Sequence, residues 1–215
     1  MSTSASTLAS VTETGVIGVI RLTQKLPRDA ATALVGGGVT VLEVTLTTPF
    51  ALESIAELTA ELPQCVVGAG TVLDADAARG AIAAGARFVV SPVFDAGVVA
   101  VCRDNDVLCM PGAVTPTELL EAWRAGASLI KVFPSSQMGP AYFHDVLAPM
   151  PFLRLVPSGG VSLANAGDWI RAGAAAVSVG TSLINAGSVR DGNGAALSND
   201  ARALVTAVAA ARQQL

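Results

Sequence analysis

Short apolar runs alternate with amphipathic stretches of helical period along the chain. The runs are rich in Val, Ile and Leu, which is typical of strands buried on both faces of a parallel sheet. Eight strands are expected, beginning near Val16, Val39, Cys65, Arg87, Val107, Ser128, Leu153 and Ala175. Each interval is long enough for one helix, as in residues 49–62 and 115–125. This alternation predicts a parallel sheet with helices outside it.

Eight strand–helix units in one domain favour a (β/α)8 TIM barrel. We expect this α/β barrel to span residues 15–215, after a flexible, Ser/Thr/Ala-rich segment at 1–14. That segment lacks the basic and apolar regions of a signal peptide. A doubly wound open sheet is the alternative, but no G-x-G-x-x-G motif follows the first strand.

A repeat supports the barrel. A glycine ends the helix before strands two, four, six and eight, at Gly38, Gly85, Gly126 and Gly173. Glycine suits the left-handed turn after a helix. Five residues further on stand Glu43, Val90, Lys131 and Ser178. Inward residues of alternate barrel strands share a layer, so we expect Glu43 and Lys131 to face each other across the interior.

Both residues are unusual where they stand. Lys131 lies in the apolar run 128–134, and the chain has only one other lysine, Lys25. Glu43 is the single charge in the β-branched and aliphatic run 40–46. A lone buried charge is costly, so each needs a partner or a cavity. A structural ion pair is one interpretation, and a catalytic pair is the other.

The catalytic interpretation has a definite chemistry. A neutral lysine amine attacks a carbonyl to form a Schiff base, and burial disfavours the charged ammonium. We expect Glu43 to be offset across the cavity and to act as general acid/base through water. The iminium is an electron sink for carbon–carbon cleavage, which is the logic of a lysine-dependent aldolase. A metal-dependent aldolase would need several histidines, whereas His144 stands alone, and no cofactor is expected.

Two loops have the sequence expected of a phosphate-binding site. Residues 157–162 follow the seventh expected strand and residues 180–182 follow the eighth, where barrels commonly bind phosphate. The candidate groups are the backbones of Gly159, Gly160 and Gly180 and the hydroxyls of Ser158, Thr181 and Ser182. Ordinary loop turns are the alternative interpretation.

Further polar residues end other expected strands. They are Arg21, Thr45, Thr47, Thr48, Thr71 and the pair Ser91-Pro92. Arg21 is the candidate clamp for a carboxylate or a phosphate, with a solvated strand end as the alternative. His144 and Asp145 are expected to face solvent, and Arg154 to lie near the opposite end of its strand.

Composition excludes several other classes. The net charge is −4 with no basic run, which argues against a nucleic-acid partner. No apolar run reaches the roughly 18 residues needed to cross a bilayer, so no membrane is expected. The three cysteines lack C-x-x-C spacing, which favours buried thiols and a cytoplasmic location.

Five motifs together resemble the 2-keto-3-deoxy-6-phosphogluconate (KDPG) and 2-keto-3-deoxy-6-phosphogalactonate aldolase family over roughly residues 16–183. They occupy residues 42–46 (LEVTL), 67–72 (VGAGTV), 130–134 (IKVFP), 158–160 (SGG) and 180–182 (GTS). The resemblance implies a class I aldolase, usually a homotrimer, that cleaves the phosphorylated keto sugar acid to pyruvate and glyceraldehyde 3-phosphate.

The resemblance also implies residue roles. Lys131 forms the Schiff base and Glu43 does the acid/base work. Thr71 lies at the pyruvate moiety and the two glycine loops bind the phosphate. Further substrate contacts are assigned to Arg21, Thr47, Pro92, Phe133 and Ser158.

The substrate epimer stays open. The gluconate type often has an arginine where Thr47 stands, whereas the galactonate type instead carries one after the first strand, as Arg21 does. Ser158 resembles the gluconate type. Cleavage of 4-hydroxy-2-oxoglutarate is a possible side activity.

Two other function classes remain open. One is a phosphate-binding barrel isomerase or synthase without Schiff-base chemistry. The other is a non-catalytic phosphosugar-binding relative.

Overall fold

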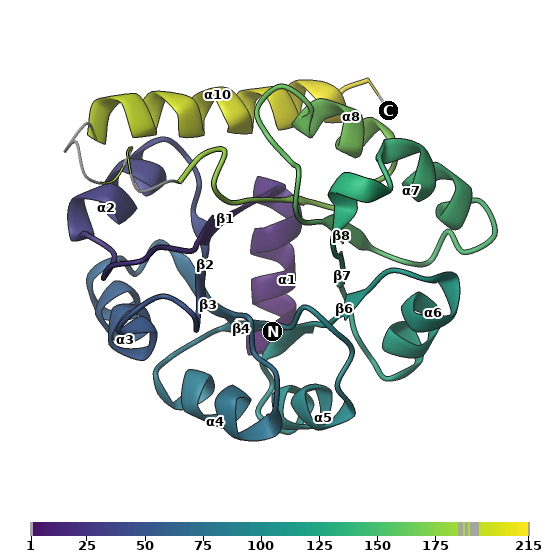
Figure 1. Cartoon of the computed structure of the whole chain (residues 1–215), viewed down its shortest axis with the longest axis horizontal. Helices are drawn as coiled ribbons and strands as arrows, with labels where there is room; N and C mark the ends of the chain where they lie inside the picture. The colour runs from purple at the N-terminus through teal and green to yellow at the C-terminus, as the bar shows by residue number, and fades with distance from the viewer. Residues whose placement is uncertain (1, 185–186, 188, 190–193, 215) are drawn as a thin grey trace.

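The computed structural model describes every residue except 1, 185–186, 188, 190–193 and 215 (Figure 1). Its strands are β1 (Val16–Ile20), β2 (Val41–Thr45), β3 (Val66–Gly70), β4 (Phe88–Val90), β5 (Leu108–Met110), β6 (Gly112–Ala113), β7 (Ile130–Val132), β8 (Leu155–Pro157) and β9 (Val177–Val179). Its helices are α1 (Thr3–Thr14), α2 (Arg28–Gly36), α3 (Ala51–Glu61), α4 (Ala75–Ala83), α5 (Ala96–Asp104), α6 (Pro116–Arg124), α7 (Pro140–Leu147), α8 (Ala166–Arg171) and α10 (Gly194–Arg212), with a 3-10 turn at Ser135–Gln137. Strands and helices alternate as the sequence predicts.

The strands form two parallel sheets, with the orders β5-β4-β3-β2-β1-β9 and β6-β7-β8. A single parallel bridge between Ser158 and Ser178 links β8 to β9. At the other junction only Pro111 separates β5 from β6. The strands curl round the centre of the molecule and the helices from α2 onward lie outside them (Figure 1). The architecture is therefore α/β, with a curled parallel sheet inside a helical layer.

The described residues contain nine strands instead of the expected eight, because the fifth is divided at Pro111. Proline has no N–H to give to a strand ladder. The Pro111 carbonyl accepts the Lys131 N–H at 2.9 Å, and the Gly112 N–H reaches the Val93 carbonyl at 3.3 Å. Pairing therefore changes from β4 to β7 at this residue.

The helix α6 shows how local sequence sets the outer layer. Thr115 caps its N-terminus in a reciprocal capping box with Glu118, and Pro116 occupies the first turn. Leu119 and Ala122 are buried on the face toward the sheet. No helix in the described part of the chain is both long and apolar enough to span a membrane.

The glycine repeat has the backbone conformation that the sequence predicts. The φ angles are +97° at Gly38, +99° at Gly85, +100° at Gly126 and +96° at Gly173. All four lie in the left-handed region, where a side chain would be strained. Each strand that follows is thus entered by the same turn, which gives the four strands a common register.

Buried apolar side chains form two groups, one on each side of the curled sheet. The larger packs the outer face against the helices and includes Leu34, Ile55 and Leu119. The smaller fills the inside and consists of Val11, Ile17, Val41, Val66, Phe88, Val90, Leu108, Met110, Leu129, Val156 and Ala176. Val41 on β2 and Leu129 directly before β7 precede Glu43 and Lys131 by two residues. Apolar packing therefore fills the interior below the two charged residues.

The N-terminal segment was expected to be loosely attached, and that expectation is wrong. Residues Thr3–Thr14 form helix α1, seen in the middle of Figure 1, which contacts β1, β2 and β5. Thr7 and Val11, one helical turn apart, are buried, and Val11 belongs to the inner apolar group. Two small buried side chains on one helical face are a weak signal in a Ser/Thr/Ala-rich composition.

Polar contacts fix both ends of α1. At its start, the Asp106 carboxylate accepts hydrogen bonds from the Thr3 N–H and the Ser4 hydroxyl. At its end, the Arg212 guanidinium donates to the Glu13 carbonyl at 2.8 Å and to the Ala175 carbonyl at 2.9 Å. The helix is thus tied to the β5 side and to α10.

The Asp106 contacts predict an acid-sensitive attachment of α1. Hydrogen bonds, from the Ser4 hydroxyl first, lower the pKa of this carboxyl. A carboxyl whose pKa is lowered in the folded state stabilises that state when the pH is above the pKa of the unfolded chain, about 3.9. This contribution is lost as the pH falls through the pKa of the folded state. In Asp106→Asn we expect the amides of α1 to exchange hydrogen several-fold faster than in wild type at pH 7, measured by mass spectrometry.

The difference should disappear as the pH falls through the lowered pKa of Asp106, because the wild-type carboxyl is then protonated as well. Asp104→Asn is the control, because Asp104 is exposed and pairs with Arg103. Unchanged protection of α1 in Asp106→Asn at pH 7 would contradict this account.

Candidate active site

Lys131 on β7 and Glu43 on β2 meet inside the curled sheet. The Lys131 Nζ and the Glu43 Oε1 are 3.9 Å apart, with side-chain exposures of 3% and 0%. The shared five-residue offset from Gly126 and Gly38 predicts this meeting, and the structure places both side chains as the offset requires. Two charge-bearing groups are thus buried above the apolar filling of the interior.

The two groups are close without being clamped together. Neither Glu43 carboxylate oxygen has a hydrogen-bond partner among the described residues. A separation of 3.9 Å is too long for a hydrogen bond. The Lys131 Nζ also lies 5.2 Å from the centre of the Phe133 ring, within cation–π range. A buried acceptor left unsatisfied costs about 1–3 kcal/mol. This arrangement therefore favours a binding or catalytic site over a structural ion pair.

Gly70 makes room for the Glu43 carboxylate, and sequence reasoning missed it. Gly70 on β3 pairs with Thr45 on β2. A Cβ atom at residue 70 would overlap the Glu43 Oε1, Cδ and Cγ atoms. Glycine inside a strand is a known signal of close approach, and the run 67–72 contains two, Gly68 and Gly70.

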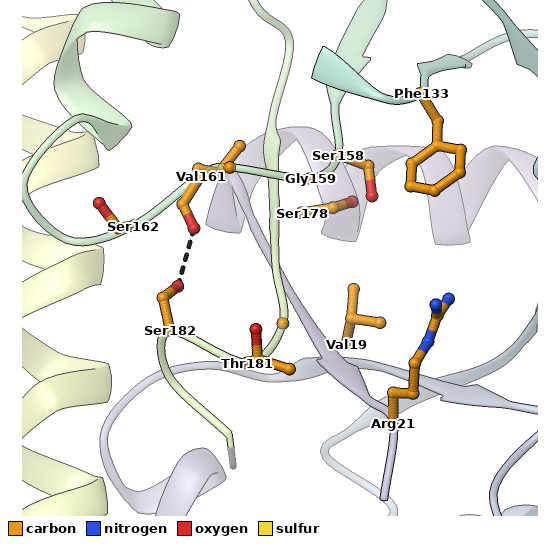
Figure 2. A pocket seen from close by; sticks show the side chains of 12 residues that line it. Val19, Arg21, Phe133, Ser158, Gly159, Val161, Ser162, Ser178, Thr181 and Ser182 are labelled. Carbon is orange, nitrogen blue, oxygen red and sulfur yellow. Dashed lines mark hydrogen bonds between the residues drawn. The ribbon is translucent and has the colours of Figure 1, made fainter. Parts of the chain in front are cut away.

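A cavity of about 260 Å³ opens at the carboxyl ends of β1, β8 and β9 (Figure 2). Its lining residues are Val19, Arg21, Phe133, Ser158, Gly159, Gly160, Val161, Ser162, Ser178, Gly180, Thr181 and Ser182. The two sequence-predicted glycine loops therefore share one cavity with Arg21, Phe133 and Ser158.

The loop after β8 exposes its backbone. Gly159 and Gly160 have φ angles of +86° and +78°, conformations that other residues rarely adopt. The side chain of Asn165 accepts the Ser162 N–H at 2.8 Å and donates to the Gly160 carbonyl at 2.9 Å. Sequence reasoning missed Asn165, although an asparagine bridging its own loop is a familiar turn device.

The loop after β9 is tied to the first one. The Ser182 hydroxyl donates to the Val161 carbonyl at 2.7 Å (Figure 2). We expected this hydroxyl to serve a phosphate, but in the structure its proton is engaged within the protein. Backbone N–H groups of the two glycine loops and the Arg21 guanidinium also line this cavity and can donate to an anion.

Arg21 reaches across to the end of β3. Its Nη2 donates to the Thr71 hydroxyl at 3.3 Å, and its side chain lines the cavity (Figure 2). Thr71 has a φ of +59°, so its backbone is held in a left-handed turn. The structure therefore brings these two predicted substrate contacts together.

Thr47 and Pro92 lie apart from this cavity. Thr47 is exposed, shares a hydrogen bond of 3.0 Å with the Thr45 hydroxyl, and lines a separate hollow near Phe50. Pro92 lines a hollow of about 370 Å³ whose wall includes Phe133. Phe133 thus forms a shared wall between that hollow and the glycine loops.

Three residues outside the site lie where the sequence predicts. The His144 and Asp145 side chains are 81% and 80% exposed, so both face solvent. Arg154 is exposed and directly precedes β8, at the end opposite the cavity.

Comparisons with known proteins show which family the chain belongs to. The model of the aldolase family "KDPG and KHG aldolase" matches residues 8–199. The chain is 41% identical over 141 residues to the 2-dehydro-3-deoxy-phosphogluconate aldolase of Treponema pallidum, covering 65% of this chain and 67% of that one. It is 36% identical over 164 residues to a probable 2-dehydro-3-deoxy-6-phosphogalactonate aldolase of Rhizobium meliloti, covering 74% and 77%.

A solved structure is also similar. The KDPG aldolase of Legionella pneumophila, with pyruvate captured at low pH as a covalent carbinolamine intermediate, superposes with a TM-score of 0.83 at 27% identity. The match covers 92% of this chain and 97% of that one. The chain belongs to the KDPG and KHG aldolase family.

Proposed function

We propose that the chain is a class I aldolase that cleaves 2-keto-3-deoxy-6-phosphogluconate, or its galactonate epimer, through a Schiff base on Lys131. The observation that carries the proposal is the buried Lys131 amine, which lies 3.9 Å from a carboxylate with no hydrogen-bond partner among the described residues. The covalent carbinolamine in the Legionella relative supports the same chemistry. The products are pyruvate and glyceraldehyde 3-phosphate.

The first half of the reaction belongs to Lys131. Its neutral amine adds to the C2 ketone of the substrate, and loss of water from the carbinolamine leaves an iminium ion. Glu43 lies 3.9 Å from Nζ and can relay protons through a water that contacts both groups from the side.

The second half breaks the C3–C4 bond. Glu43 accepts the proton of the C4 hydroxyl, the C4 oxygen becomes the aldehyde, and the bonding electrons move into the iminium to give an enamine. Glyceraldehyde 3-phosphate leaves, the enamine is protonated at C3, and water releases pyruvate. The phosphate lies against the Gly159-Gly160 and 180–182 loops, where backbone N–H groups suit an oxyanion.

We also propose that the two sheets close into one (β/α)8 barrel domain that includes α1. Closure is supported by the Ser158–Ser178 bridge at one junction and by the one-residue step from β5 to β6 at the other. The chain would then be a single domain with its active site at the carboxyl ends of the strands.

The native state proposed is a cytoplasmic homotrimer. The loops after β2, β3 and β4 expose Phe50, Leu73 and Val93 by 62%, 56% and 53%, and these strands are neighbours. Such an apolar surface is suited to contact with another copy. The three free, buried cysteines fit a reducing compartment. A monomer mass in sedimentation equilibrium would exclude the trimer.

Covalent trapping tests the central proposal. Borohydride and pyruvate should attach one reduced adduct, which peptide mass mapping locates at Lys131. Lys25→Ala is the matched control, because Lys25 is the only other lysine and pairs with Glu57 on the surface. Lys131→Ala should keep the fold and lose the adduct and turnover. An unlabelled wild-type protein would favour an isomerase, a synthase or a non-catalytic binder instead.

The role of Glu43 predicts a selective loss. Glu43→Gln should still form the imine, at a reduced rate, but proton exchange at the methyl group of pyruvate should fall by at least about a hundredfold, the scale of general acid–base catalysis. Exchange is followed by NMR in deuterated water. Glu57→Gln, at an exposed surface pair, should leave exchange unchanged. Normal exchange in Glu43→Gln would assign the proton transfer to another group.

Arg21, which lines the cavity, should bind the substrate carboxylate, whereas the exposed Thr47 lines a separate hollow. An arginine offers a charge-assisted, bidentate bond, and its loss costs about 1.5–3 kcal/mol, or roughly ten- to a hundredfold in affinity. Arg21→Ala should therefore lower the affinity for pyruvate itself, measured by calorimetry. Arg79→Ala, paired with Asp76 on the surface, is the control. If pyruvate affinity is intact and only glyceraldehyde 3-phosphate binds less tightly, Arg21 serves the phosphate.

A further inference from the structure

Ser178 is a buried polar residue for which the mechanism above has no use. It lies in the middle of β9, is 2% exposed and lines the 260 Å³ cavity. Its hydroxyl has no hydrogen-bond partner among the described residues. Leaving a buried hydroxyl unsatisfied is unfavourable, and alanine at this position would avoid it.

Backbone pairing accounts for the position of Ser178 in the sheet, but it does not account for the side-chain hydroxyl. Ser178 is aligned with Ile17 on β1 on one side and joined to Ser158 by the isolated bridge on the other. These pairings hold the strand at the junction of the two sheets. The hydroxyl takes no part in them, so its presence has to be explained by something that enters the cavity.

Ser178 lies at a level between the proposed sites for the two ends of the substrate, Lys131 and the glycine loops. Ser178 stands five residues after Gly173, as Lys131 stands five residues after Gly126, so it belongs to the layer of the lysine. Gly180, the first residue of the anion-binding loop, follows two positions later on the same chain. In Figure 2 its side chain lies beside that of Ser158, between the Gly159 loop and Val19.

The substrate has one hydroxyl that suits this place. C2 is held by Lys131, the C4 oxygen gives its proton to Glu43, and the phosphate on C6 meets the glycine loops. The C5 hydroxyl lies next to the phosphate-bearing carbon and takes no part in bond breaking. Ser178 lines the cavity that holds the loops, whereas Lys131 and Glu43 do not.

We propose that the Ser178 hydroxyl hydrogen-bonds the C5 hydroxyl of the substrate, which is the C2 hydroxyl of the released aldehyde. Ser178 is then a specificity residue that selects phosphorylated 2-hydroxyaldehydes over aldehydes without that hydroxyl. This inference rests on the aldolase function proposed above. A serine can donate and accept, so it matches a hydroxyl partner in either direction.

The test compares two aldehydes in the direction of carbon–carbon bond formation. Pyruvate is condensed with D-glyceraldehyde 3-phosphate or with 3-oxopropyl phosphate, the same aldehyde without its hydroxyl. In Ser178→Ala, kcat/KM for glyceraldehyde 3-phosphate should fall about three- to tenfold relative to kcat/KM for 3-oxopropyl phosphate, which is the scale of one neutral hydrogen bond. Ser178→Cys, close to serine in size but a weak donor, should show the same change in the ratio.

The matched control is Ser54→Ala. Ser54 on α3 is also 2% exposed with an unsatisfied hydroxyl, but it does not line the cavity. Its replacement should leave the ratio of the two kcat/KM values at the wild-type figure. Equal losses with both aldehydes in Ser178→Ala would reduce Ser178 to a structural role and overturn the proposal.

An unchanged ratio in both Ser178 variants would overturn it as well. Borohydride trapping of pyruvate separates this failure from that of the aldolase proposal. If Lys131 is labelled while the ratio stays constant, only the role of Ser178 is wrong. If wild-type Lys131 is not labelled, the aldolase function itself is wrong.

Discussion

Lys131 and Glu43 are buried opposite each other without a hydrogen bond between them, and the rest of the molecule depends on this constraint. At 3.9 Å and an effective dielectric constant near 20, two full charges attract by about 4 kcal/mol. Removing each from water costs several kcal/mol, so the pair adds little to stability and is weak evidence for a structural role. The protein tolerates it because apolar packing on both faces of the sheet fixes the two strands that carry it. A substrate carbonyl and water can supply the partners that the protein withholds.

Much of this arrangement could be predicted from the sequence because it follows from periodicity. Strand positions follow from apolar runs, and the common register of alternate strands follows from four glycines at equivalent turns. The meeting of Glu43 and Lys131 is a consequence of that register. The shared cavity of the loops at 158–160 and 180–182 follows from β8 and β9 being neighbours at the junction of the sheets.

The features that sequence reasoning missed depend on single contacts. Helix α1 is held by Asp106 and Arg212, which are distant in sequence and carry no periodic signal. The division of the fifth strand depends on the missing N–H of Pro111. Gly70 matters only because the Glu43 carboxylate occupies the volume of its absent side chain. The Ser182 hydroxyl likewise donates to the Val161 carbonyl, a contact between two loops that no sequence pattern indicates.

The apolar side chains beneath Lys131, with α1 packed against them, also determine where ligands enter and leave. Within the described residues, the interior on that side is packed with side chains, so ligands enter and leave at the carboxyl ends of the strands. In the proposed reaction, the three-carbon unit on Lys131 would lie at the bottom of this one-ended space, and the aldehyde would lie nearer the opening. That placement would require the aldehyde to depart before pyruvate is freed and, in the reverse direction, pyruvate to bind first. The proposed reaction would thus take its kinetic order from the packing of α1 and the inner apolar group.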